Sequence, residues 1–91
     1  MLVRIARFHT TPPTGSDWIA DVLRGQPGVR CVYHASQPDA DGYISVTVLD
    51  DEASLEQAGR AISARRKELG YQSQPPDSAD MYVVDHCIEN F

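Results

Sequence analysis

The chain has 91 residues, enough for one compact domain but too few for a two-domain Rossmann enzyme or a (β/α)8 barrel. Its 13 acidic and 8 basic residues give a net charge of −5, and a surface with this excess of negative charge is a poor partner for a phosphate backbone. No apolar run approaches the roughly 20 residues that a membrane span needs. We therefore expect a single soluble domain over residues 1–91 that binds neither nucleic acid nor membrane.

Three further features of the whole chain concern its location in the cell, its oligomeric state and its cysteines. The N-terminal residues 1–7 alternate in character and lack the apolar segment of a signal peptide, which favours a cytoplasmic protein. A chain of this size buries only somewhat over about 60% of its unfolded surface, so a homodimer is a natural way to bury more. Cys31 and Cys87 are far apart, with no C-x-x-C motif and no nearby histidine pair, so the sequence predicts two buried thiols and no metal site.

The first quarter of the chain predicts a strand followed by a short helix. Residues 2–9 are mainly apolar or β-branched, and the proline pair at 12–13 ends the strand. Thr14 or Ser16 can cap a helix that ends at Gly25. The apolar residues of this helix recur at helical spacing, at Trp18, Ile19, Val22 and Leu23.

Residues 29–36 and 43–49 read as two strands joined by a short polar loop, which predicts a β-hairpin. Pairing Ser36 with Tyr43 places on one face His34 opposite Ser45, Val32 opposite Thr47, and Arg30 opposite Leu49. The other face is apolar throughout, with Cys31, Tyr33, Ala35, Ile44, Val46 and Val48. A face that mixes polar and apolar side chains is typical of a pocket lining rather than of a dry core.

The second half predicts a long helix and a final strand. Asp50 or Asp51 caps a helix that ends before Gly70, and its acidic start and basic end agree with the helix dipole. One face carries the stripe Leu55, Ala58, Ile62 and Leu69, with Arg65 in its gap. The basic cluster near Gly70 is expected to be solvated. Residues 71–79 form a polar loop, and residues 80–88 form the last strand.

The element order β-α-β-β-α-β is typical of the ferredoxin-like α+β fold, with one antiparallel sheet of order 4-1-3-2 and both helices on one face. This layout puts the two cysteine-bearing strands at opposite edges of the sheet. It also gathers a group of rings at one end of the sheet, namely His9, Trp18, His34, Tyr43, Tyr71 and Tyr82. His86 falls at the opposite end. The group is either ordinary packing beneath loops or the mouth of a pocket for a planar aromatic molecule.

Several segments resemble the antibiotic biosynthesis monooxygenase-like family of the dimeric α+β-barrel superfamily. They are MLVRIARF at 1–8, QPGV at 26–29, YHAS at 33–36 and SVTVLDDEA at 45–53. The resemblance implies a homodimer whose two sheets form a shared barrel, with a small cavity in each protomer. It also implies oxidation of an aromatic, polyketide-like metabolite by molecular oxygen with no metal or flavin, so no cofactor is expected.

The chain departs from this family at the positions that carry its chemistry. Family monooxygenases typically place an Asn in the third strand, a Trp at its end and, in some members, a Tyr early in the second helix, where this chain has Ser45, Leu49 and Leu55. Haem-degrading relatives use an Asn in the first strand, where this chain has Arg7 or Phe8. Haem therefore stays a minor alternative. A homodimer that only binds a small molecule, or is structural, is the alternative to an enzyme.

His34 is the candidate catalytic base, because imidazole titrates near neutral pH and can take a phenolic proton. The alternative is that His34 has a purely structural role and forms a hydrogen bond to Ser45 across the hairpin. Arg30 is the candidate partner for a carboxylate or enolate oxygen, and its alternative is an ion pair with Asp50 or Asp51. Six further residues are expected to bind the substrate: Trp18, Ser45, Thr47, Leu49, Tyr82 and His9.

Overall fold

The chain folds as a four-stranded antiparallel sheet with two helices on one face. The computed structural model describes residues 1–10, 15, 17–38 and 41–88. The elements are β1 (Leu2–Phe8), α1 (Asp17–Arg24), β2 (Val29–Ser36), β3 (Tyr43–Leu49), α2 (Glu52–Leu69) and β4 (Ser78–Val83). The strand order β2-β3-β1-β4 confirms the predicted ferredoxin-like fold. The predicted helix caps Thr14 and Ser16 lie outside the described residues.

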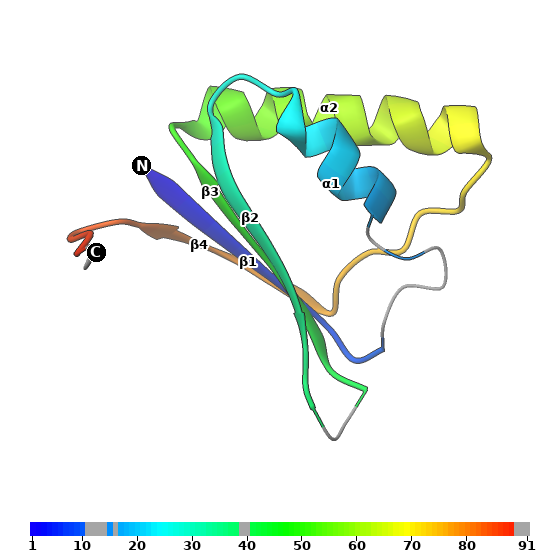
Figure 1. Cartoon of the computed structure of the whole chain (residues 1–91), viewed down its shortest axis with the longest axis horizontal. Helices are drawn as coiled ribbons and strands as arrows, with labels where there is room; N and C mark the ends of the chain where they lie inside the picture. The colour runs from blue at the N-terminus through cyan, green and yellow to red at the C-terminus, as the bar shows by residue number, and fades with distance from the viewer. Residues whose placement is uncertain (11–14, 16, 39–40, 89–91) are drawn as a thin grey trace.

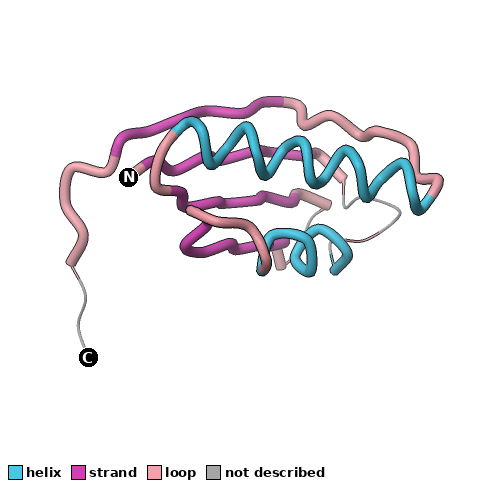
Figure 2. The backbone as a smooth tube through the Cα atoms, turned by 90° about the horizontal axis from the view of Figure 1, so that it is seen from above, coloured by secondary structure: helices cyan, strands magenta, loops and turns pink. Residues whose placement is uncertain are grey.

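The two helices leave one face of the sheet uncovered (Figure 1). Seen from above, α1 and α2 lie side by side over the strands, and α1 packs against both α2 and β2 (Figure 2). β2, which carries Cys31, and β4, which precedes Cys87, are the two edges of the sheet, as expected. None of the described helices is both long enough and apolar enough to cross a bilayer.

Strand alternation divides the side chains of the sheet between an inner face, towards the helices, and an outer face. In the register of β1 with β3, Ala6 lies opposite Ser45 and Leu2 opposite Leu49 on the inner face. The buried residues of the described chain are Ala6, Leu23, Tyr43, Thr47, Leu49, Ser54 and Ala58. Every strand residue in this set is on the inner face, so the core of the protomer lies between sheet and helices.

Both ends of α2 are capped as the sequence predicts. Asp51 is the N-cap: its side chain accepts hydrogen bonds from the backbone N–H of Ser54 and from the Ser54 hydroxyl, both at 2.8 Å. These bonds, the backbone one most strongly, hold the pKa of the Asp51 carboxyl below its usual range. Gly70 ends the helix in the left-handed region, with φ 71°.

The last strand differs from the prediction, because β4 covers Ser78–Val83 rather than residues 80–88. Its limits are set by β1, against which it pairs from Arg7 to Leu2. The N–H of Val84 still bonds to the carbonyl of Met1 at 3.1 Å, and residues 85–88 that follow are not in a strand. Cys87 is consequently exposed and Cys31 is half-buried, so the expectation of two buried thiols was wrong.

A close backbone approach at Gly28 fixes the start of α2 against the loop before β2. The Gly28 carbonyl accepts a 2.9 Å hydrogen bond from the N–H of Asp50, next to the N-cap. Gly28 has φ +81°, and a Cβ there would overlap the Ser54 side chain. Glycine is therefore required at this position both by its backbone conformation and by space.

We predict that Gly28→Ala destabilises the protein more than Gly70→Ala. Both glycines have positive φ, but a Cβ at Gly70 would meet nothing within 4 Å. Gly70→Ala should cost about 1 kcal/mol of unfolding free energy from backbone strain alone, and Gly28→Ala about 2 kcal/mol or more because overpacking adds to the strain. Urea denaturation of the two variants measures the difference. Equal losses would contradict the close packing of Gly28 on Ser54.

Candidate functional site

A cavity of about 430 Å³ lies between the inner face of the sheet and the two helices. Its apolar wall comes from the sheet, from both helices and from the loop after α2, namely Ala6, Phe8, Ile19, Leu23, Leu49, Leu55, Ala58, Ile62 and Pro76. Its polar or aromatic-polar groups are Arg4, Trp18, His34, Tyr43, Ser45, Thr47, Ser63, Arg66, Gln72 and Gln74. An apolar cavity with a few converging polar groups is the usual form of a small-molecule site.

Five of the eight predicted catalytic and substrate-binding residues lie in the wall of this cavity: Trp18, His34, Ser45, Thr47 and Leu49. The hairpin register accounts for four of them, because His34 is opposite Ser45 and Val32 is opposite Thr47, as predicted. Trp18 reaches the wall from the first turn of α1. The mixed polar and apolar face of the hairpin is therefore the cavity lining that its composition indicated.

His34 lies on the β2 side of the cavity, close to Tyr43. The two rings are tilted, with centroids 5.9 Å apart. Among the described residues, the imidazole has no hydrogen-bond partner, so the alternative of a bond to Ser45 is not observed. Burial lowers the pKa of His34 below its ordinary value of 6.5, while the nearby Asp17 carboxylate opposes this by favouring the charged form. The ring is therefore neutral at pH 7 and able to accept a proton.

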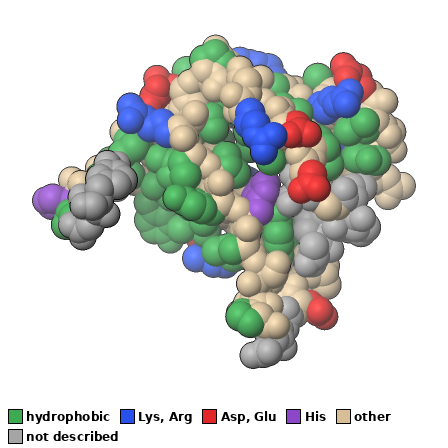
Figure 3. Space-filling view, in the orientation of Figure 1, with side chains coloured by type: hydrophobic (Ala, Val, Ile, Leu, Met, Phe, Trp, Pro, Cys, Tyr) green, Lys and Arg blue, Asp and Glu red, His purple; other side chains and the backbone are tan. Residues whose placement is uncertain are grey.

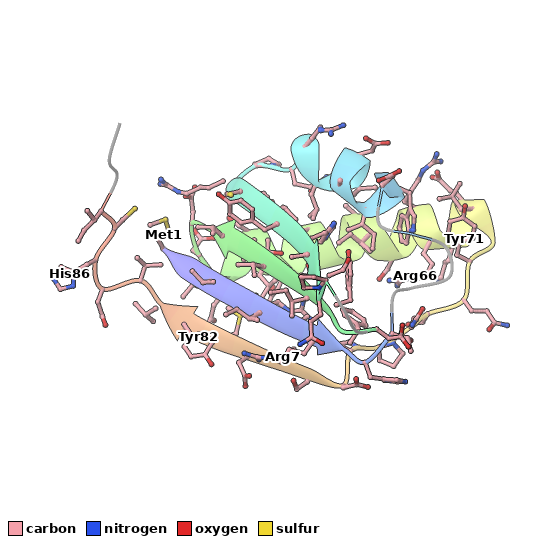
Figure 4. The ribbon with its side chains drawn as sticks, turned by 60° about the horizontal axis from the view of Figure 1, so that its bottom comes forward. Met1, Arg7, Arg66, Tyr71, Tyr82 and His86 are labelled. Atoms are coloured by element: carbon pink, nitrogen blue, oxygen red, sulfur yellow. The ribbon has the colours of Figure 1, made fainter. Side chains whose placement is uncertain are left out.

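Three side chains form a stack at the end of the cavity near the C-terminus of α2. The Arg66 guanidinium lies 5.6 Å from the centroid of the Trp18 ring. Tyr71 meets the same indole edge to face, with centroids 5.7 Å apart. Figure 4 shows Arg66 and Tyr71 together at this end, with His86 at the far end of the molecule, as expected.

Arg66 was missed by the sequence reasoning, which treated it as part of a solvated basic cluster. Its place in the cavity could have been predicted from its position four residues after Ile62, on the same face of α2 as Leu55 and Ala58. Arg65, which the periodicity placed in the gap of the stripe, instead pairs with Glu68 at 2.9 Å outside the cavity.

Two donors on residues of the cavity wall are buried without partners among the described residues. They are the indole Nε1 of Trp18 and the hydroxyl of Tyr43, whose residue is only 7% exposed. Buried polar groups in native proteins are nearly always hydrogen-bonded, so these two donors are exceptions within the described part of the chain.

Arg30, predicted to project from the pocket face, does not reach the cavity. A β-bulge between Val29 and Cys31 removes it from the register, and Val29 rather than Arg30 lies opposite Leu49. The Arg30 side chain is exposed and pairs with Asp50, which is the alternative considered for it.

His9 and Tyr82 also lie outside the cavity. His9 follows the end of β1, is exposed, and its ring Nδ1 lies 2.8 Å from a carboxylate oxygen of Asp77. Tyr82 lies opposite Val3 on the outer face of the sheet. Because β4 starts at Ser78, Tyr82 is near the end of the sheet that carries Met1, and not in the group of rings around Trp18 (Figure 4).

The described residues contain no group of three His, Cys, Asp or Glu side chains able to hold a metal ion. The chemistry available in the cavity is therefore that of one neutral imidazole, two guanidinium groups, and hydroxyl, amide and indole donors. This set can bind a planar polar molecule and remove a proton from it.

Similar solved structures share this fold over nearly the whole chain. Rv0793 from Mycobacterium tuberculosis has a TM-score of 0.69 and 15% identity, covering 96% of this chain and 98% of that chain. SnoaB, a cofactor-independent oxygenase from Streptomyces nogalater, has a TM-score of 0.67 and 16% identity, covering 98% of this chain and 97% of that chain. The monooxygenase ActVA-Orf6 of Streptomyces coelicolor, in complex with the ligand nanaomycin D, has a TM-score of 0.62 and 13% identity, covering 99% of this chain and 92% of that chain.

These structures establish that the chain has the fold of the antibiotic biosynthesis monooxygenases, as the sequence resemblance implied. Identities of this size extend to the fold and not to the chemistry. No protein-family model matches the sequence, and no curated protein matches it.

We predict that Tyr43→Phe leaves the stability of the ligand-free protein unchanged or raises the unfolding free energy by about 1 kcal/mol. Removing a buried hydroxyl that lacks a protein partner relieves a desolvation cost without breaking a bond. Tyr82→Phe, on the outer face, is the matched control and should have no effect. Thermal and urea unfolding measure both variants. A loss above about 1 kcal/mol for Tyr43→Phe alone would show that the hydroxyl has a protein partner.

Proposed function

We propose that the cavity binds a planar aromatic small molecule and that the protein oxidises it with molecular oxygen and no cofactor. The observation that carries this proposal is the half-buried imidazole of His34, whose pKa burial lowers, in the wall of an apolar cavity of about 430 Å³. The similarity of the fold to SnoaB, a cofactor-independent oxygenase, supports the chemistry, and the complex of ActVA-Orf6 with nanaomycin D supports a small-molecule ligand.

The chemistry requires little of the protein beyond binding, deprotonation and exclusion of water. His34 takes the phenolic proton, and the resulting electron-rich phenolate reacts with oxygen. One oxygen atom enters the ring as a carbonyl and the other leaves as water, so that a phenol and O2 give a quinone and H2O. The substrate loses four electrons and O2 gains four, so no other reductant is needed.

We predict that His34→Gln lowers kcat/KM for oxidation of an electron-rich polycyclic phenol by about 100-fold or more, the usual contribution of a general base. Oxygen uptake measured with an electrode reports the rate. His86→Gln, at the far end of the molecule, is the matched control and should retain full activity. An undiminished rate in His34→Gln would rule out His34 as the base.

The pH dependence of this reaction should follow the lowered pKa of His34. The base acts when neutral, so kcat/KM should be at its plateau at pH 7 and fall on acidification only below pH 6.5, the ordinary histidine value. Asp17→Asn removes a charge that favours the protonated ring, so the acid limb should move to still lower pH. A limb that stays in place or moves upward in Asp17→Asn would contradict this assignment.

A binding protein without turnover is the second candidate. Ser45, Leu49 and Leu55 line the cavity where the resembled monooxygenases typically carry Asn, Trp and Tyr. Replacing these groups removes polar contacts to a substrate while leaving an apolar site that can still hold it. Saturable binding of polycyclic phenols with no oxygen uptake, in a protein whose His34→Gln variant binds equally well, would select this function over the oxygenase.

We further propose that the protein is a homodimer joined through the outer faces of its sheets. This face is apolar over three strands, with Val3, Ile5, Cys31, Tyr33, Ala35, Ile44, Val46 and Val48. Tyr33 is 63% exposed, and Figure 3 shows hydrophobic side chains gathered on the side of the sheet away from the helices. A continuous apolar sheet face of this kind marks an interaction surface.

We predict that Val46→Lys converts the protein to a monomer. Val46 lies at the centre of the outer face, opposite Ile5 on one side and Tyr33 on the other. Burying an ammonium group there should raise the dimer Kd by about 100-fold or more. Gln57→Lys on the exposed side of α2 makes the same change in charge and should leave the dimer intact. Sedimentation velocity measures both, and a dimeric Val46→Lys would place the interface elsewhere.

A further inference from the structure

The wall of the cavity has a charge opposite to that of the protein as a whole. The chain carries a net charge of −5, with 13 acidic residues. Among the described residues that line the cavity there is no Asp or Glu, whereas Arg4 and Arg66 are both present. Asp17 lies near His34 but outside the wall. The two guanidinium groups are therefore the permanent charges of this lining.

Arg4 is a cation on the inner face of a central strand, where burial normally requires a partner. It lies in β1 between Thr47 of β3 and Met81 of β4, and it is half-buried. Among the described residues it has no ion pair and no hydrogen bond to its side chain. This contrasts with Arg7, three positions along the same strand on the outer face, which pairs with Asp80 at 3.0 Å. Charged side chains are rarely buried unless paired.

Arg66 is likewise half-buried and has no carboxylate partner among the described residues. Its guanidinium lies over the Trp18 ring, which orients it without neutralising it. The neighbouring Arg65 again provides the contrast, because it is paired with Glu68 outside the cavity. Arg60 of α2 is also without an ion pair among the described residues, but it is exposed and lies outside the cavity. Arg4 and Arg66 are the half-buried arginines of β1 and α2, and both line the cavity without a protein counterion.

We propose that the aromatic substrate carries a carboxylate, and that Arg4 and Arg66 supply its countercharge. The geometry of a guanidinium group matches a carboxylate through two parallel N–H donors, and such pairs are strongest in partly desolvated sites. This inference deepens the proposed function, and it rests on that function only in placing the substrate in this cavity.

The chain contains a built-in reporter for testing the inference, because Trp18 is its one tryptophan and lies in the cavity wall. Two ligands of nearly equal size and shape are compared, anthraquinone-2-carboxylate and anthraquinone-2-carboxamide, by quenching of tryptophan emission at pH 7. The carboxylate should bind at least tenfold more tightly than the amide, a difference of about 1.4 kcal/mol. Added NaCl should reduce this preference by weakening the binding of the acid.

Matched arginine variants test whether Arg4 and Arg66 cause the preference for the carboxylate over the amide. Arg4→Gln and Arg66→Gln should each lower the ratio of the two affinities, and the double variant should bring it close to one. Arg66→Lys should retain part of the preference, because it keeps the charge. Arg65→Gln removes one positive charge from the next position of the same helix and should leave the ratio unchanged. The affinity for the uncharged amide shows in each variant whether the cavity is still formed.

The experiment separates this inference from the oxygenase proposal because it measures binding without turnover. Equal affinities for the acid and the amide in the unmodified protein would overturn the carboxylate inference and leave the oxygenase proposal standing. A preference that survives in the double variant would overturn the role of Arg4 and Arg66. Absence of binding by both ligands would overturn planar aromatic carboxylates as the ligand class. Strong preference for the acid without oxygen uptake by any phenolic acid would support the inference and favour the binding protein.

Discussion

The alternation of side chains along the two central strands determines what each face of the sheet can do. β1 and β3 are paired so that every inner residue of one lies opposite an inner residue of the other. Their outer positions are Val and Ile over most of the contact, which fits a dry interface. Their inner positions include Arg4, Ser45 and Thr47, which fit a wall exposed to a polar ligand. A shift of one residue in this register would exchange the two faces, so the site and the proposed dimer surface depend on the same pairing.

The helices close the inner face only partly, and the position of α2 decides which groups reach the cavity. The contact between Gly28 and Asp50 fixes where the helix starts, and the Asp51 cap fixes its first turn. From that start, the helical period carries Leu55 and Arg66 round to the cavity and leaves Arg65 outside. The strongly amphipathic α1, only eight residues long, then places Trp18 beneath the Arg66 guanidinium. A shift of one residue in the start of α2 would therefore rotate Arg66 away from the cavity and from Trp18.

The sequence was sufficient for the fold and for the hairpin part of the site, because both follow from local periodicity. The pairing of His34 with Ser45 needed only two alternating strands and a short turn. Arg30 was misplaced because a β-bulge adds one residue to β2. The composition of the strand does not distinguish a bulged strand from a regular one. Tyr82 was misplaced because the ends of an edge strand are set by the length of its partner, β1, far away in the sequence. Predicting that Arg66 faces the cavity required knowing the exact rotation of α2 about its axis. The apolar stripe alone did not decide between Arg65 and Arg66.

The titratable and permanent charges of the cavity have separate functions in this arrangement. His34 is kept neutral by burial, so it is available to accept a proton but contributes no attraction for an anion at pH 7. Arg4 and Arg66 remain charged at every physiological pH, so they can hold an anion but cannot act as bases. An ionised phenolate formed at His34 would also lie in the field of these guanidinium groups, which favours the deprotonated form of the substrate over the phenol. The charges inferred to select the proposed substrate would thus also promote its first chemical step, in a protein whose overall charge would otherwise oppose both.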